Sequence, residues 1–171
     1  GCYYLTIDRP DGKGAGRVFS SPDEAMMAYQ LGQLSLQAPI KVRLEREFNG
    51  EKGRKIIDCT LGLLLFNEVI PQDIGRKPRT CLDEMFALEI DMKVGKKQLG
   101  QIVDMCFRKH GVAETARVLD NVKAMGYKYS TKGAISVSIA DMVVPSVKYE
   151  MVHSAEKKVV EICLLYTSDA A

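Results

Sequence analysis

The alternation of hydrophobic and polar positions predicts a chain of short helices and strands. The clearest helix start lies at Ser21, which is followed by Pro22 and, three residues after the serine, by Glu24. A hydroxyl N-cap, a proline at the first helical position and an acid at the third form a capping box. We therefore expect a helix from this point, interrupted or ended by Gly32.

The strand signals lie on both sides of an Asn49-Gly50 dipeptide. Residues 40–44 (IKVRL) alternate apolar and polar side chains, as a half-buried strand does. Residues 45–54 read as a charged turn, because Asn-Gly strongly favours a hairpin, and residues 55–59 read as the returning strand. Further extended segments are expected at residues 18–19, 86–92 and 127–138.

Apolar residues at helical spacing predict four more helices. They are expected at residues 60–70, 95–110, 113–125 and from 147 onward, with Pro71, Gly111 and Gly126 ending the first three. Residues 1–7 read as a short buried strand or helix end, and residues 8–17 as a loop. Because no βαβ series or repeat appears, the predicted fold class is α+β, with mixed short strands and helices.

Composition narrows the class of protein without indicating its chemistry. The 171 residues are 46% hydrophobic and 27% charged, with a net charge of +2, which fits one domain or two small ones. No basic block marks a nucleic-acid surface. No signal peptide is seen, and the longest apolar run, residues 61–66, is too short to span a bilayer.

Cysteine usage argues against a zinc site. The five cysteines lie far apart, no CxxC pair occurs, and only His110 and His153 could add ligands. Free thiols in a reducing cytoplasm are the simpler interpretation.

A glycine-rich stretch, Gly12–Arg17, has the composition of a phosphate-binding loop. Such a loop should follow a strand and open directly into a helix, so that backbone N–H groups face the phosphate. Here an extended piece precedes the helix start at Ser21, and no GxxxxGK[ST] occurs. A flexible loop is therefore favoured over a nucleotide site.

The remaining candidate side chains each have a structural interpretation. His110 lies near a helix C-terminus, where it complements the dipole, and His153 lies in an amphipathic helix; neither has a nucleophile and an orienting group beside it. Four carboxylates could form a metal site but lack a DxDxD pattern, and five cations could meet phosphate or simply face water. They are Asp83, Glu84, Glu89 and Asp91, and Arg76, Lys77, Arg79, Lys96 and Lys97.

Several segments, in a fixed order, resemble one known family. They are GCYYLT at residue 1, KGAGRVFSSPDEAMMAY at 13, LQAPIKVR at 36, CTLGLLLFNEVIP at 59, VGKKQL at 94 and GYKYSTKGAISVSIADMVVP at 126. The chain is identified on these segments as resembling the β′ subunit of bacterial DNA-directed RNA polymerase. The apolar start at Gly1, without an initiator methionine, suggests an internal fragment of that subunit.

The resemblance implies a role in DNA-templated RNA synthesis, a nucleotidyl transfer, without catalytic, cofactor-binding or metal-binding residues in this segment. In the family the Mg²⁺-binding N-A-D-F-D-G-D loop lies upstream, outside this chain. Residues 1–58 would end the catalytic-barrel region, residues 59–145 would form the pore and funnel of the secondary channel, and residues 146–163 would begin one arm of the coiled coil at the channel rim. Residues 164–171 look non-native, and Thr167–Asp169 should break the last helix.

The implied partners are those of the complete cytoplasmic enzyme: the β, α and ω subunits, a sigma factor, DNA, RNA, and nucleoside triphosphates entering by the channel, with no membrane. The side chains expected to line the channel are Lys128, Ser130, Lys132 and Asp141. The two lysines would attract triphosphates. Leu63 stands where the family usually has Arg, so the contact made by that Arg is in question here.

Two other functions fit the residues less well. A stand-alone, non-enzymatic interaction domain should have a complete fold with polar ends. A small nucleotide-binding enzyme using Gly12–Gly16 should bind ATP or GTP, but the Walker lysine pattern is missing.

Overall fold

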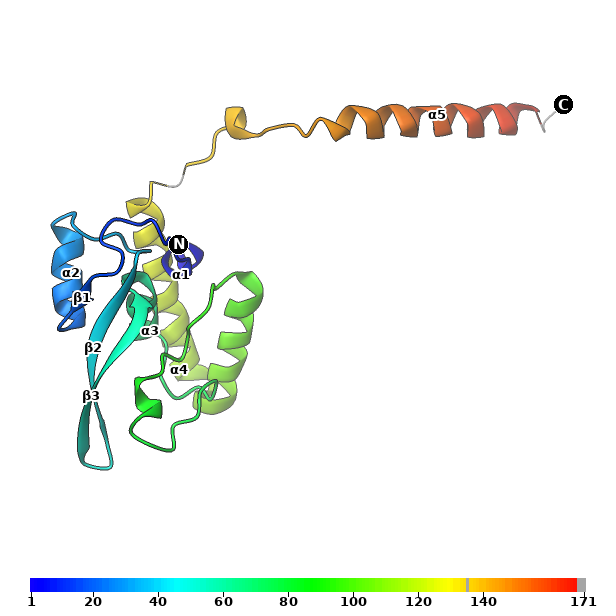
Figure 1. The fold of residues 1–171 in the computed structure, drawn as a ribbon. Coiled ribbons are helices and arrows are strands. Elements are labelled where there is room, and N and C mark those ends of the chain that lie inside the picture. The colour runs from blue at the N-terminus through cyan, green and yellow to red at the C-terminus, as the bar shows by residue number, and fades with distance from the viewer. Residues whose placement is uncertain (135, 169–171) are drawn as a thin grey trace. The chain divides into compact units, whose positions relative to one another are not determined.

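The computed structural model describes residues 1–134 and 136–168. The chain divides into two compact units, Gly1–Ile135 and Ser136–Ala171. The first unit holds a sheet and four α-helices, and the second holds a short 3₁₀ helix and a long α-helix (Figure 1). The fold is α+β, as the sequence predicts.

The N-terminal part of the first unit begins with a helix, α1 (Cys2–Thr6), which decides between the two expected alternatives. The short strand β1 (Val18–Phe19) leads into α2 (Pro22–Gln30). The Ser21 hydroxyl accepts a hydrogen bond from Glu24 N at 3.2 Å. The Glu24 carboxylate reaches one residue further back than a capping box requires, accepting from Ser20 N at 2.6 Å.

The sheet has three strands in the order β1-β2-β3. β1 runs parallel to β2 (Pro39–Phe48), which pairs antiparallel with β3 (Glu51–Thr60). The turn is confined to Asn49 and Gly50, whose φ values of 50° and 86° fit a type I′ turn. The expected ten-residue charged turn is therefore wrong, since the ladder continues to the Phe48–Glu51 pair.

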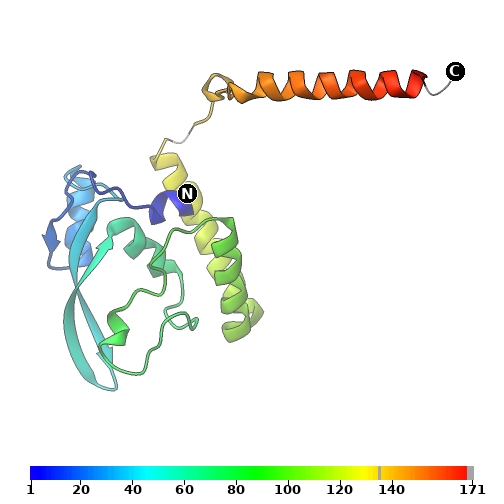
Figure 2. The ribbon, with the colours of Figure 1, turned by 45° about the vertical axis from the view of Figure 1, so that its right-hand side comes forward.

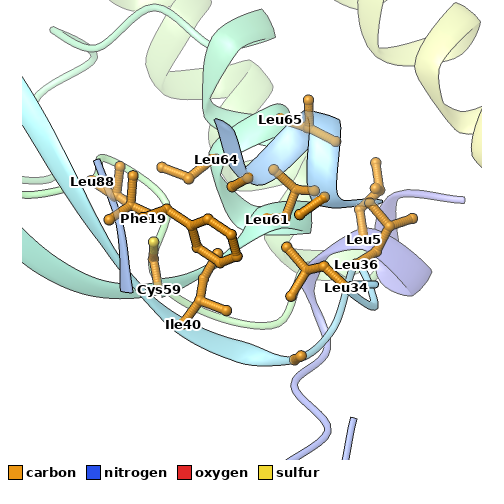
Figure 3. Close-up of a cluster of buried hydrophobic side chains, with 14 of the residues drawn as sticks. Leu5, Phe19, Leu34, Leu36, Ile40, Cys59, Leu61, Leu64, Leu65 and Leu88 are labelled. Carbon is orange, nitrogen blue, oxygen red and sulfur yellow. The ribbon is translucent and has the colours of Figure 1, made fainter. Parts of the chain in front are cut away.

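The central helix α3 (Leu61–Val69) carries the main core. Thr60 caps it by accepting from Leu63 N at 3.2 Å. Buried side chains from α1, β1, β2 and α3 meet in one hydrophobic cluster (Figure 3). Its members include Leu5, Phe19, Leu36, Ile40, Leu61 and Leu64.

The segment after α3 is irregular, apart from a 3₁₀ turn, η1 (Glu84–Phe86). The expected strand at residues 86–92 is therefore wrong. Its backbone donors go to side chains instead of to a ladder: Glu89 N donates to Gln72 Oε1 at 3.3 Å and Ile90 N to Asn67 Oδ1 at 2.9 Å. Val94 N donates to Thr6 Oγ1 at 2.9 Å. Side chains distant in sequence thus replace strand pairing.

Helix α4 (Lys96–Lys132) consists of two helical segments that meet at Gly111. Gly111 has φ 75° and ψ −172°, a conformation that is essentially restricted to glycine. The break at this residue agrees with the sequence prediction. The two segments, residues 96–110 and 112–132, lie side by side (Figure 2). They share a second hydrophobic cluster that includes Ile102, Cys106, Val118 and Val122.

The second segment of α4 continues through Gly126 to Lys132, so the predicted helix end at Gly126 is wrong. The predicted strand at residues 127–138 is also wrong for the residues that the structure describes, and residue 135 lies outside them. The helical positions Val118, Val122 and Tyr129 are all buried on one side, and this burial favours the helix over the β-prone composition. Gly126 is a packing position. A Cβ on Gly1 would lie 2.0 Å from its carbonyl oxygen, so α1 and α4 approach backbone to backbone.

The second unit contains η2 (Ile139–Asp141) and α5 (Val147–Ser168). From Val147 to Tyr166 every residue of α5 is exposed. The helix continues through Thr167 and Ser168, so the expected break at those residues is wrong, while Asp169 lies outside the described residues. In the part of the chain that the structure describes, no helix is both long and apolar enough to cross a membrane.

Candidate functional site

The lysines expected to face the channel lie on the last turns of α4. The ammonium of Lys128 lies 5.6 Å from the centre of the Tyr129 ring, and that of Lys132 lies 5.6 Å from the same ring. Lys132 also lies 5.7 Å from the ring of Tyr29 on α2. Cations at this distance from aromatic faces are attracted to them, so both charges are held at one end of the helix.

The two tyrosines stay neutral beside these cations at physiological pH. Burial raises the pKa of the Tyr129 hydroxyl above its ordinary value, with further contributions from Tyr29 and Glu68. Burial also raises the pKa of Tyr29. Because a neutral tyrosine contributes no negative charge, the positive charges of Lys128 and Lys132 remain available to an anion.

The other two expected channel residues are placed differently. Ser130 is half-buried on α4 and lines a largely apolar cavity of about 520 Å³ between α1 and α4. Asp141 belongs to η2 in the second unit, where its carboxylate accepts from Ser138 N at 2.8 Å. The first unit therefore brings Lys128, Ser130 and Lys132 onto neighbouring turns, and Asp141 is not among them.

Backbone N–H groups of the glycine loop donate to backbone carbonyl oxygens instead of facing a ligand. Gly12 N donates to Arg9 O, Ala15 N to Gly12 O, and Gly16 N to Pro39 O, at 2.9, 3.0 and 2.8 Å. Since these N–H groups already have carbonyl partners, they cannot line up toward a phosphate. The loop interpretation is the one that the structure supports.

The acidic and basic candidates of residues 76–91 largely neutralise one another. Lys77 pairs with Asp91 at 2.6 Å and Arg79 with Glu89 at 3.2 Å. Asp83 pairs with Lys55, and Glu84 accepts from the backbone and hydroxyl of Thr80. Across residues 1–134 and 136–168, no three His, Cys, Asp or Glu side chains gather closely enough to hold a metal ion.

The remaining candidate side chains lie in ion pairs, at the surface or as free thiols. His110 Nε2 lies 2.8 Å from Asp73 Oδ1 at the break in α4, and His153 Nδ1 lies 3.9 Å from Glu156 Oε2 on exposed α5. Lys96 and Lys97 are exposed on the first turn of α4. Cys2, Cys59, Cys81 and Cys106 are free thiols.

Comparison with known proteins identifies the family. The family model "RNA polymerase Rpb1, domain 3" matches residues 1–142. This chain belongs to the RNA polymerase Rpb1 domain 3 family.

The Rpb1 domain 3 match is accompanied by close similarity to bacterial β′ subunits. The DNA-directed RNA polymerase subunit β′ of Acetivibrio thermocellus is 49% identical over 166 residues, which cover 97% of this chain and 14% of that protein. The subunit of Clostridium acetobutylicum is 51% identical over 166 residues, with the same coverage. The chain thus spans 14% of the length of these curated relatives. These relatives do not favour the stand-alone interaction domain.

One departure from the family pattern is explained by the Rpb1 domain 3 core. Leu63, where the resemblance leads us to expect Arg, is half-buried and packs against the main hydrophobic cluster. A leucine there adds apolar contact to the start of α3, but its side chain cannot donate a hydrogen bond as an arginine side chain can.

Sequence reasoning missed a buried polar network beneath the 72–91 segment of this Rpb1 domain 3 chain. Asn67 Nδ2 donates to Leu63 O and Ile90 O, both at 2.8 Å. Glu89 is fully buried and accepts from Arg76 N at 2.6 Å as well as from Arg79. The available signal was Asn67 itself, a polar residue inside the apolar run 61–70, because buried amides need partners.

Proposed function

We propose that this chain acts as an internal segment of the β′ subunit of a bacterial DNA-directed RNA polymerase, a cytoplasmic nucleotidyltransferase. The observation that carries the proposal is the match of residues 1–142 to Rpb1 domain 3, together with about 50% identity to β′ subunits over 97% of the chain. In this proposal the chain meets the β, α and ω subunits and a sigma factor, and meets DNA and RNA through the complete enzyme.

The segment contributes shape and charge rather than bond chemistry. Its described residues do not fit a Mg²⁺ site, because their carboxylates are dispersed and engaged with cations and backbone donors. We place the Mg²⁺ ligands elsewhere in the subunit. Phosphoryl transfer depends chiefly on positioning and electrostatics, so a wall that guides triphosphates can affect the reaction without touching the metal.

The proposed organisation follows the expected boundaries. Residues 1–58 end the catalytic-barrel region, 59–145 line the secondary channel, and 146–163 start a rim helix, with residues 164–171 as a non-native extension. Support for the rim helix comes from the exposed apolar positions Val152, Val159 and Ile162 of α5, whose spacing of seven and three residues suits a coiled-coil partner.

The function of the whole segment is tested by placing it in the β′ subunit of a relative. Residues 1–163 would replace the matching stretch of the Clostridium acetobutylicum β′ subunit, and the reconstituted polymerase would be assayed for promoter-dependent RNA synthesis. We expect assembly and transcription close to those of the parent enzyme. An assembled polymerase without transcription would contradict the proposal.

Lys128 and Lys132 are the proposed triphosphate-attracting residues. Their charges are held by Tyr29 and Tyr129, while Asp120 on the same helix is engaged by Lys123. In the exchanged polymerase, Lys128→Gln with Lys132→Gln should raise the apparent nucleotide KM about two- to tenfold, because steering by local charge increases association rates by ~10-fold or more.

The control for the lysine experiment removes two charges elsewhere. Lys41 and Lys52 lie in exposed ion pairs of the sheet, at 3.6 Å from Asp58 and 3.8 Å from Glu47. Lys41→Gln with Lys52→Gln should leave KM unchanged. An equal KM shift in both double variants would mean that net charge, and not this site, is responsible.

A further inference from the structure

A second site lies in a cavity of about 420 Å³ that is lined by the end of β2, the segment after α3 and the first part of α4. The cavity is lined by two apolar side chains, three cationic side chains and one carboxylate, that of Asp73. The lining residues are Phe48, Gln72, Asp73, Gly75, Lys77, Arg79, Met85 and Lys109.

The walls of this cavity are fixed by hydrogen bonds behind them. Gln72 Nε2 donates to Asn67 O and Ile70 O, both at 2.9 Å, while its Oε1 accepts from Glu89 N. The Arg79 guanidinium donates to Met85 O at 3.1 Å, Ala87 O at 3.0 Å and Glu89 Oε2 at 3.2 Å. A ligand would therefore meet a preformed surface, which lowers the entropic cost of binding.

Unused donors on two lysines point to an anionic ligand. Lys77 is engaged by the single carboxylate of Asp91, although an ammonium has three donors. Lys109 is engaged by the backbone and side-chain oxygens of Asp73. Of the three lining cations, Arg79 is neutralised by Glu89 behind the wall, while Lys77 and Lys109 keep ammonium donors beyond their single carboxylate partners.

The geometry favours a phosphoryl group over a carboxylate. A carboxylate is best recognised by the two-pronged fork of arginine, but both terminal nitrogens of Arg79 already have partners. The lysines Lys77 and Lys109 act as point charges, which suit the several oxygens of a phosphate. Phe48 and Met85 add apolar surface beside them.

We propose that this cavity binds a phosphate ester, with Lys77 and Lys109 meeting the phosphoryl oxygens and Phe48 and Met85 covering the organic group. The existing ion pairs of Lys77 and Lys109 do not prevent this. The side chains of Asp91 and Asp73 are 48% and 53% exposed, and exposed pairs of this kind contribute little, so a dianion competes with them.

The test is a calorimetric titration of phenyl phosphate into the 171-residue chain at low salt, with inorganic phosphate titrated in parallel. We expect one saturable site that binds phenyl phosphate more tightly than inorganic phosphate. Lys77→Gln with Lys109→Gln should weaken phenyl phosphate binding at least about tenfold, since two charge-assisted contacts are lost.

Matched variants keep the result interpretable. Lys41→Gln with Lys123→Gln removes the same charge from two exposed ion pairs outside the cavity and should leave the affinity unchanged. Phe48→Ala, at a position outside both core clusters, should lower phenyl phosphate affinity while sparing inorganic phosphate. Absence of saturable binding, equal losses in the two lysine variants, or an unaffected Phe48→Ala variant would each overturn the proposal.

Discussion

At the scale of single residues, the most buried ion pair in the irregular segment after α3 is that of Glu89 and Arg79. The Glu89 side chain is 0% exposed and that of Arg79 is 16% exposed. Such a pair adds little net stability compared with an apolar replacement, but breaking one side leaves a buried charge without its partner. The segment after α3 should therefore depend strongly on this carboxylate.

Glu89→Gln should lower the free energy of unfolding by about 3 kcal/mol, because the guanidinium of Arg79 loses its counter-charge in a buried site. Urea denaturation followed by circular dichroism measures the change. The matched control is Asp91→Asn, which removes the exposed pair with Lys77 and should cost at most about 1 kcal/mol. Equal midpoints for the two variants would show that Glu89 is not needed as a charge.

Burial also sets the reactivity of the cysteines. Cys59 is 8% exposed, and burial, with a smaller contribution from Asp58, raises its pKa from 9.0 to about 12. Its thiolate is therefore scarce in the folded protein below that pH. Cys81, by contrast, is exposed.

Iodoacetamide at pH 8 should accordingly modify Cys81 and spare Cys59, as peptide mass spectrometry would report.

The raised pKa of Cys59 also makes the stability of the protein depend on pH. The unfolded chain loses the Cys59 proton near pH 9 while the folded chain keeps it until about pH 12, so stability falls across that interval. Cys59→Ser should flatten this part of the pH profile; an unchanged slope would count against the assignment.

At the scale of elements, Gly111 divides one long helix into two packed segments. Gly111→Ala should destabilise the protein by about 1–3 kcal/mol, because an L side chain is strained at φ 75° and ψ −172°. Gly100 gives the opposite control, since it is helical with open space around it. Gly100→Ala should stabilise by about 0.5–1 kcal/mol. Thermal unfolding of both variants distinguishes strain from a general effect of alanine.

The elements that the sequence predicts well are those with local chemical signals. Ser21 and Thr60 cap their helices through their own hydroxyls, and Asn49-Gly50 closes the hairpin. The expected strand at residues 86–92 failed because the backbone donors of Glu89 and Ile90 are satisfied by Gln72 and Asn67, which lie 17 and 23 residues away in sequence. No local pattern contains that information.

The candidate site, too, could be predicted from the sequence only in part. Lys128, Ser130 and Lys132 were selected from a family resemblance, and their role in a channel stays a prediction. Their arrangement could not be foreseen, because it depends on a helix that continues through Gly126 and on Tyr29 reaching them from α2. The pairing of Arg79 with Glu89 requires the folded loop, so composition showed two separate charge clusters where one network exists.

At the scale of the whole molecule, the described core side chains belong to the first unit. Both hydrophobic clusters draw their members from residues before 130, and the described residues of α5 up to Tyr166 are exposed. The first unit therefore contains the packing needed for its own cooperative unfolding, whereas α5 gains no burial from its own unit.

Truncation after Ala134 should leave the thermal midpoint of the first unit within about 2 °C of the full chain, since no core contact is removed. The far-ultraviolet circular dichroism should lose only the helical signal of the second unit. Differential scanning calorimetry provides the measurement. A midpoint lowered by more than about 5 °C would show that residues beyond 134 stabilise the first unit.

The Asn49–Gly50 turn gives the chain a convenient attachment point. Both residues are exposed, and the charged pairs Arg54–Glu45 and Lys52–Glu47 separate them from the core cluster. Exposed loop tips of this kind tolerate inserted residues. A short tetracysteine tag or a single fluorophore placed there would report on the assembly of a polymerase containing this segment while leaving both hydrophobic clusters intact.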